Sequence, residues 1–142
     1  MRTILSLATI AFLLCSLGIA RTEEDVSVAI KLVVMENLKA TQAEDLDRMM
    51  KTIHTQSPSY LQTKQQIAPI FDHFDLSYRL LTYSYIGLDG EYAVARVKQA
   101  TKKVSGPAFQ NNELDLMQVF RKENGKWKFW AQAILEMKYT NE

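Results

Sequence analysis

The 142 residues suit a single domain. With 17 basic and 16 acidic side chains, the chain is close to neutral, which argues against nucleic-acid binding because that needs a basic face. Cys15 is its single cysteine, so the chain has neither an internal disulfide nor a thiolate metal site.

The N-terminus has the three-part pattern of a secretory signal peptide. Arg2 supplies a positive charge, residues 4–17 form an apolar run, and Gly18 and Ala20 are small residues placed for cleavage. The apolar run is shorter than the roughly 20 residues that span a bilayer, and an acidic stretch follows it. We therefore expect residues 1–20 to be a signal peptide that is removed after Ala20.

Cleavage at this point implies a mature domain of residues 21–142 that is periplasmic or secreted and has no membrane anchor. This domain has 16 basic and 16 acidic side chains and no cysteine. We expect it to bind no cofactor and no metal, because its two histidines lack metal-ligand spacing.

Helical periodicity dominates the first half of the mature chain. Apolar residues recur every three or four positions over residues 25–39, which predicts a first helix. Thr41 and Glu44 have the spacing of a capping box and predict that a second helix starts just after Thr41. A third helix is predicted over about 60–74, where Pro69 should kink or divide it.

The second half of the chain has the alternation of strands. Two-residue turn signals, Asp89-Gly90 and Asn124-Gly125, each separate two such runs and predict two hairpins. The predicted strands cover residues 76–88, 91–103, 113–123 and 126–138. Helices followed by strands indicate an α+β fold, with three helices packed on an antiparallel sheet.

The hairpin turns also predict which residues face the helices, because a two-residue turn fixes the register. In the first hairpin, the uncharged face is expected to point inward, and Tyr83 and Tyr85 are expected at the surface. Its many small residues would leave space for a pocket. This predicted inner face consists of Tyr78, Leu80, Thr82, Ser84, Ile86, Ala93, Ala95, Val97, Gln99 and Thr101.

The last hairpin is treated in the same way. Phe120 is predicted to oppose Phe129, and Leu116 to oppose Ala133. The more apolar face should pack on the helices. It consists of Leu114, Leu116, Gln118, Phe120, Trp127, Phe129, Ala131, Ala133 and Leu135.

Two segments resemble the nuclear transport factor 2-like superfamily, also known for its SnoaL-like and cystatin-like members. Residues 71–78, FDHFDLSY, look like that family's junction between helix and long strand, and residues 119–128, VFRKENGKWK, look like its last hairpin. The resemblance spans about residues 25–138. It implies a curved sheet that forms a cone-shaped half-barrel, but it does not imply one function, because this fold hosts enzymes, binding proteins and adaptors.

Enzymes of this superfamily generally need a carboxylate or a histidine inside the cone. The predicted inner face has neither, which argues against proton-transfer chemistry. His54 and His73 are the candidate catalytic bases, and Asp72 is a carboxylate beside His73. The alternative interpretation is that Asp72 caps a turn and His73 is solvated.

Three polar residues of the predicted inner face are candidates for ligand binding. Tyr78, Gln99 and Gln118 offer a hydroxyl and two amides inside an otherwise apolar cone, which would hold the polar group of a small, mainly apolar ligand. The alternative is that the three side chains satisfy one another in the core.

The outer face of the last hairpin predicts an interface. Val119 is expected opposite Trp130, and Met117 and Ile134 extend the patch inside a charged rim. A contiguous apolar patch of this kind suits a homodimer with a two-fold axis.

The sequence thus favours an exported small-molecule-binding or scaffold protein that forms a homodimer. Two alternatives remain open at this point: a small cone-pocket enzyme, such as a lyase, isomerase or cyclase, that uses His54 or His73, and a protein–protein adaptor of the cell envelope.

Overall fold

The computed structural model describes the backbone of residues 11–141 and the side chains of residues 23–141. Residues 1–10 of the predicted signal peptide lie outside the described residues, and residues 11–20 belong to the first helix. Among the described residues, no helix has the length and apolar character needed to cross a membrane.

Three helices precede the strands, as expected: α1 (Ala11–Gln42), α2 (Leu46–Lys51) and α3 (Tyr60–His73). The predicted start of the second helix is wrong. Thr41 still belongs to α1, where its hydroxyl donates to the Asn37 carbonyl at 2.8 Å. Glu44 adopts a left-handed conformation in the turn, and Asp45 caps α2 by accepting from the Arg48 amide at 2.9 Å.

Helix α3 contains Pro69 but is not divided by it. Proline removes one intrahelical hydrogen bond, and a helix interior normally resists this change. Pro69 is exposed here, so water can satisfy the Gln65 carbonyl that loses its partner.

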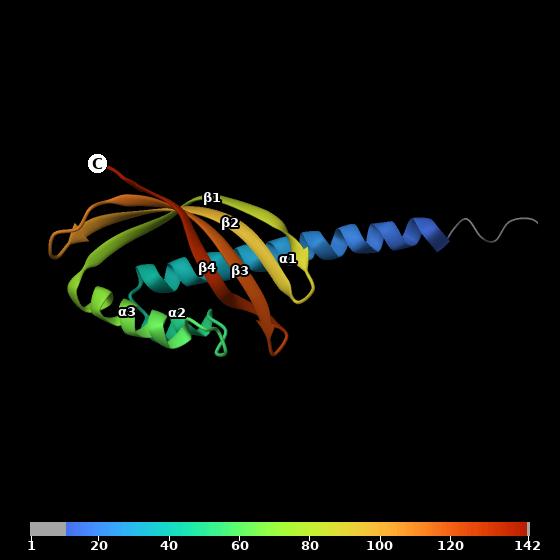
Figure 1. Ribbon diagram of the computed structural model, residues 1–142, viewed down its shortest axis with the longest axis horizontal. Coiled ribbons are helices and arrows are strands. Elements are labelled where there is room, and N and C mark those ends of the chain that lie inside the picture. Colours follow the sequence, from blue (N-terminus) through green and yellow to red (C-terminus); the bar gives the residue numbers. More distant parts are fainter. Residues whose placement is uncertain (1–10, 142) are drawn as a thin grey trace, which may run out of the picture.

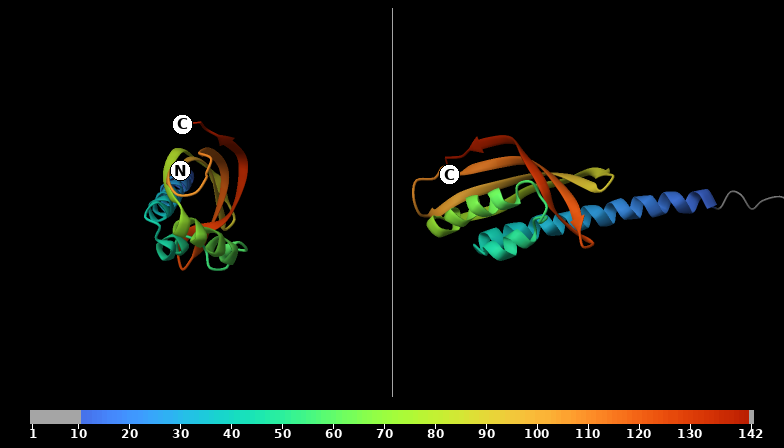
Figure 2. Two further views of the ribbon diagram at one scale, coloured as in Figure 1. Left: turned by 90° about the vertical axis from the view of Figure 1, so that its left-hand side faces the viewer. Right: turned by 60° about the horizontal axis from the view of Figure 1, so that its bottom comes forward.

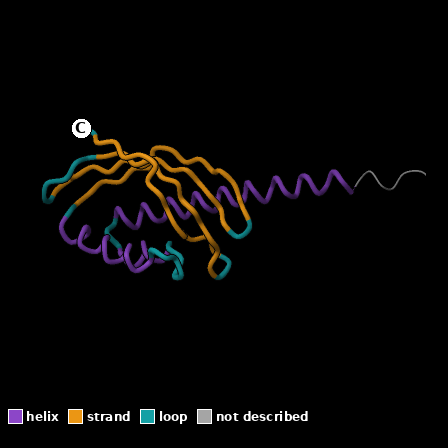
Figure 3. The backbone as a smooth tube through the Cα atoms, viewed as in Figure 1, coloured by secondary structure: helices purple, strands orange, loops and turns teal. Residues whose placement is uncertain are grey.

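Four strands form one antiparallel sheet in the order β1-β2-β3-β4 (Figures 1 and 3). Their bounds lie within two residues of the predicted ones: β1 (Asp75–Asp89), β2 (Tyr92–Ser105), β3 (Asn112–Glu123) and β4 (Lys126–Tyr139). The sheet is strongly curved and does not close into a barrel, and the three helices cover its concave side (Figure 2). The predicted α+β architecture is therefore confirmed.

The main core lies where α1 crosses the middle of the sheet. Ile30 and Val34, one turn apart on α1, are buried against β2 and β3. The inward residues of β2 are small, which allows the helix to approach the sheet closely, and Phe120 fills the space beside them. The predicted inner residues Ala93, Ala95 and Val97 are all completely buried.

The predicted inner face of β1 is wrong in its central part. The first turn lies at Gly90-Glu91, so Asp89 pairs with Tyr92, and two β-bulges then shift the register. Tyr83 and Tyr85 consequently pack against the main core, and the Tyr83 hydroxyl donates to the Ser27 carbonyl at 2.8 Å. The residues that trade places with them are exposed: Thr82, Ser84 and Ile86.

The last hairpin follows the predicted register only from the turn to the pair Phe120–Phe129. A bulge at Trp130 then moves it by one residue: Val119 pairs with Ala131 instead of Trp130, and Leu116 pairs with Ile134 instead of Ala133. A second bulge, at Leu135, follows. The inward residues of this part of β4 are thus Gln132 and Ile134. Ala131, Ala133 and Leu135, predicted to face inward, do not oppose the buried residues of β3.

Candidate ligand-binding site

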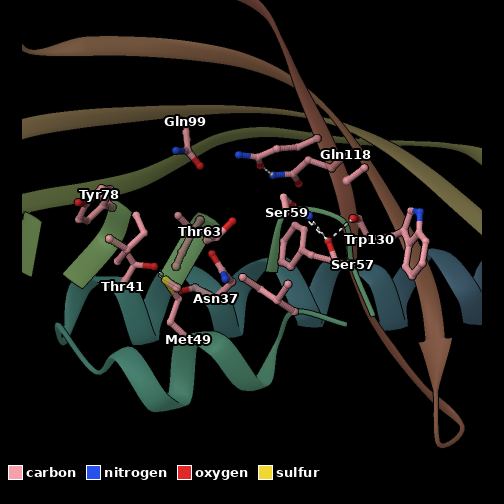
Figure 4. Close-up of a pocket in the computed structure, with 16 residues that line it drawn as sticks. Asn37, Thr41, Met49, Ser57, Ser59, Thr63, Tyr78, Gln99, Gln118 and Trp130 are labelled. Atoms are coloured by element: carbon pink, nitrogen blue, oxygen red, sulfur yellow. Dashed lines mark hydrogen bonds between the residues drawn. The ribbon is translucent and has the colours of Figure 1, made fainter. Parts of the chain in front are cut away.

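A cavity of about 190 Å³ lies between the three helices and the concave side of the sheet (Figure 4). Every element from α1 to β4 contributes to its wall. The helical side supplies Asn37, Leu38, Thr41, Met49, Ile53, Ser57, Ser59, Thr63 and Ile67, and the strands supply Tyr78, Gln99, Gln118, Phe129, Trp130, Ala131 and Gln132.

The wall of this cavity is uncharged. The described residues that line it include no carboxylate, no histidine, no lysine and no arginine. Its polar groups are side-chain amides and hydroxyls, which donate and accept hydrogen bonds without gaining or losing a proton near neutral pH. This wall can therefore recognise a neutral molecule, but it offers no general acid or base of ordinary strength.

The side chain of Gln118 has a buried polar atom without a hydrogen-bond partner inside the cavity. Its side chain, on β3, is only 4% exposed. Its amide nitrogen donates to the Gln132 side-chain oxygen at 3.4 Å, but its own oxygen has no hydrogen-bond partner among the described residues. Exchanging the oxygen and nitrogen of both amides would leave a free donor instead, so one group stays unpaired in either orientation.

Tyr78 and Gln99 lie on the same side of the cavity, on β1 and β2. Leu80 pairs with Gln99 and Tyr78 with Thr101, so both residues point inward as the sequence indicated. Burial raises the pKa of the Tyr78 hydroxyl, and the charge of Glu44 raises it further. Tyr78 therefore stays protonated and can donate a hydrogen bond.

Several lining residues were missed by the sequence reasoning. Gln132 was assigned to the outer face, because a bulge leaves no mark in the alternation of residues. The position of Asn37 could have been predicted from the sequence. It follows Val33 and Val34 by four and three residues, so it lies on the buried face of α1. Its side-chain amide donates to the Thr52 hydroxyl at 2.7 Å and closes one corner of the cavity.

His54 lies outside this cavity, although it is buried to 4% exposure. It belongs to a short segment that runs beside β4: the Phe129 amide donates to the Thr52 carbonyl, and the His54 amide donates to the Phe129 carbonyl, each at 2.9 Å. The edge of its ring meets Trp130, with the ring centres 4.9 Å apart.

Glu123 holds the segment that follows His54. Its carboxylate accepts from the Thr55 amide at 3.0 Å and from the Thr55 hydroxyl, and it pairs with Lys128. The imidazole Nδ1 of His54 lies 3.5 Å from a Glu123 oxygen and accepts from the Gln56 amide at 3.1 Å. These contacts fasten the segment of residues 54–56 to the end of β3 and the start of β4.

His73 and Asp72 are both exposed at the end of α3 and do not line the cavity. A ring nitrogen of His73 lies 2.7 Å from the Pro69 carbonyl, one turn earlier in the same helix. The structure thus does not bring the two histidines together: His54 lines a separate, open polar space of about 480 Å³ near the last turn, and His73 lies at the exposed end of α3. Among the described residues, no cluster of three metal-ligating side chains occurs.

The predicted outer patch is only partly assembled. Met117 and Val119 keep their place on the outer side of β3, and the Trp130 ring remains near Tyr92 and Arg121, at 6.1 Å and 4.8 Å. Figure 4 shows its indole directed away from the cavity. Ile134 leaves the patch, because its pairing with buried Leu116 puts it on the inner side of the sheet.

Solved structures with the same fold come from several bacteria. A proposed aromatic ring hydroxylase from Novosphingobium aromaticivorans matches with a TM-score of 0.66 and 13% identity, covering 80% of this chain and 92% of that one. A nuclear transport factor 2-like protein from Cytophaga hutchinsonii matches with a TM-score of 0.61 and 19% identity, covering 78% and 95%.

A third structure, a proposed dehydratase of the nuclear transport factor 2-like family from Streptomyces avermitilis, matches with a TM-score of 0.61 and 14% identity, covering 77% and 94%. At such identities the likeness shows the fold alone. The predicted fold is confirmed by these matches.

No curated protein matches the chain. The sequence pattern of one family does match, over residues 32–140, which includes the last third of α1 and all of the sheet and cavity. By this match the chain belongs to the family of the anti-sigma-I factor RsgI9 C-terminal domain, and it has the nuclear transport factor 2-like fold.

Proposed function

We propose that this protein is an exported binding domain that holds a small, uncharged molecule in the cavity beneath its sheet. The observation that carries the proposal is the unpaired, buried side-chain oxygen of Gln118 in an uncharged wall. A buried polar atom without a partner costs about 1–3 kcal/mol, and a ligand donor at this position would recover that cost.

The size and chemistry of the cavity limit the ligand. Its volume of about 190 Å³ is below the roughly 300–1,000 Å³ of pockets for drug-sized ligands. An N–H or O–H group would face Gln118, and an acceptor would face the Tyr78 hydroxyl. The apolar body of the ligand would contact Leu38, Ile67 and Phe129, which also line the space.

A binding role is favoured over the two alternatives by the same features. Proton-transfer catalysis needs a base near the substrate, and both histidines lie outside the cavity. An adaptor with a filled cone would have no such space. The matching family is named for the C-terminal domain of an anti-sigma-I factor, and this name states no enzymatic activity.

Screening with uncharged fragments tests the proposal. Small amides and alcohols are added to isotopically labelled protein, and the amide NMR signals of Thr63, Gln99 and Ala131 are followed. We expect saturable shifts for some fragments, with affinity at least tenfold weaker in Gln118→Leu, since one good hydrogen bond is worth about 1.4 kcal/mol.

Gln110→Leu is the matched control, because Gln110 is an exposed glutamine away from the cavity and should leave the affinity unchanged. If no uncharged fragment shifts these signals, or if Gln118→Leu binds as well as the natural sequence, the proposed site is rejected.

Export rests on the N-terminal sequence pattern and has its own test. Protein isolated from the cell envelope or medium should begin at Arg21 by N-terminal sequencing. Protein recovered with Met1 intact and confined to the cytoplasm would contradict this part of the proposal without affecting the binding site.

A further inference from the structure

The last strand ends the sheet, and only the first part of its outer edge is covered. Near the turn, the segment around Ile53 pairs with Phe129, and the Ser57 hydroxyl donates to the Trp130 carbonyl at 2.6 Å. Beyond Trp130 the described residues provide no further partner for this edge. Every residue from 131 to 139 is exposed, and Figure 2 shows this part of β4 on the side away from the helices.

The uncovered stretch is unusually apolar for a sheet edge. Its large apolar side chains are between 45% and 59% exposed: Ile134, Leu135, Met137 and Tyr139. Glu136 and Lys138 are its only charged residues, and it contains no proline. Proteins that stay monomeric usually protect such an edge with proline or several charges, because unpaired main-chain groups invite another strand.

The direction of the main-chain groups follows from one hydrogen bond. The Thr140 amide donates to the Asn111 carbonyl at 2.9 Å, so this pair of residues bonds across β3 and β4. Bonded and non-bonded pairs alternate along antiparallel strands. The amide and carbonyl of Tyr139 and of Met137 therefore point away from β3, toward the empty side.

We propose that this edge pairs with the same edge of a second copy of the chain, antiparallel, with the two-fold axis at Met137. Each Met137 would then exchange two main-chain hydrogen bonds with its counterpart. In this register Glu136 of one copy lies opposite Lys138 of the other, and the reverse pair forms by symmetry. The two sheets join into one of eight strands.

Charge complementarity favours a second copy of this chain as the partner of the edge. The sequence Glu136-Met137-Lys138 is self-complementary when reversed about its central residue, and no other strand is needed to neutralise both charges. The pairing also covers part of the apolar side chains that are exposed in a single copy. It places the interface on the edge of the sheet, whereas the sequence pattern alone had suggested the outer face.

This interface does not depend on ligand binding. The cavity lies among residues up to Gln132 on β4, whereas the paired stretch is centred five residues farther along. Loss of the dimer and loss of the ligand site are thus separable results.

Sedimentation equilibrium of the purified protein tests the proposal through charge reversal. The natural sequence should be a dimer, and Glu136→Lys should weaken dimerisation at least tenfold, because two like-charge pairs, each of order 1 kcal/mol, replace two opposite-charge pairs. The double variant Glu136→Lys with Lys138→Glu should restore the dimer, since the opposite charges face each other again.

Asp72→Lys is the control, because Asp72 is an exposed carboxylate at the end of α3, away from β4, and this change should leave the dimer intact. A monomeric natural protein at the highest measurable concentration would overturn the proposal. A dimer that Glu136→Lys leaves unchanged, or that the charge-swapped variant fails to restore, would also overturn it.

Discussion

The amide nitrogen of Gln118 donates to the oxygen of Gln132 across β3 and β4, while the oxygen of Gln118, buried in the cavity, has no partner among the described residues. The pair joins a satisfied exposed residue to an unsatisfied buried one. A protein keeps an unpaired buried acceptor only at a cost in stability, so we attribute this acceptor to ligand binding and not to folding.

The first prediction follows from that cost. Gln118→Leu removes the unpaired acceptor and leaves an apolar group of similar size, so the free energy of unfolding should stay equal or rise by about 1 kcal/mol. Denaturant unfolding measures this change, with Gln110→Leu as a surface control. A loss of more than about 2 kcal/mol would mean that Gln118 is a structural hydrogen-bonding centre.

Much of this fold could be predicted from the sequence, because turns and alternation are local signals. Asn124-Gly125 fixed the pairing of Phe120 with Phe129, and the small inward residues of β2 were assigned correctly. Tyr78, Gln99 and Gln118 were also placed on the inner face, and all three line the cavity.

The errors come from bulges and from contacts between distant segments. A bulge adds one residue to a strand without a composition signal. The bulge at Trp130 moved Gln132, Ala133 and Ile134 to the face opposite the predicted one, and the bulge at Leu135 then restored the predicted alternation. The burial of His54 depends on its pairing with Phe129, 75 residues later, which no local pattern reveals.

A second prediction concerns Asp115, a carboxylate on the outer side of β3 that is 4% exposed. Arg96 donates to both of its oxygens, at 2.8 and 2.7 Å, and Lys98 lies at 3.4 Å. The hydrogen bonds from Arg96, followed by those from Lys98 and by the charges of both residues, lower the pKa of Asp115 from 3.8 to about 2, against the opposing effect of burial.

A folded-state pKa below the usual value means that the ionised form stabilises the fold. This stabilisation is complete above about pH 4 and is lost as the pH falls toward 2. Asp115→Asn should therefore lower the melting temperature at pH 7 and narrow its difference from the natural sequence at pH 2. Calorimetry across this range gives the comparison, and parallel curves for the two proteins would contradict it.

The third prediction concerns Glu123, which holds the segment beside β4 through Thr55. Hydrogen bonds from Lys128 and then Thr55 lower its pKa to about 2, so it remains charged throughout the neutral range. Glu123→Gln should weaken these charge-assisted bonds by about 2 kcal/mol and speed amide exchange at Thr55 by at least tenfold. Glu91→Gln, which breaks the exposed pair with Arg121, should leave this amide unchanged.

The last prediction concerns Gly106, in the loop between β2 and β3. Its φ is +111°, and a Cβ atom there would lie 2.6 Å from the His73 carbonyl oxygen and 3.1 Å from the Phe74 Cα. Both neighbours are main-chain atoms at the end of α3, so they cannot move aside without displacing the start of β1. Gly106→Ala should therefore cost about 3 kcal/mol, from backbone strain and from this clash together.

Gly125→Ala separates the two contributions. Gly125 has a φ of +75° in the last turn, and a Cβ atom there would meet nothing within 4 Å. Only conformational strain applies, so the expected cost is about 1 kcal/mol. Denaturant unfolding of both variants gives the difference directly. Equal costs would show that the end of α3 yields easily, and that the loop at Gly106 does not fix the position of the helix against the sheet.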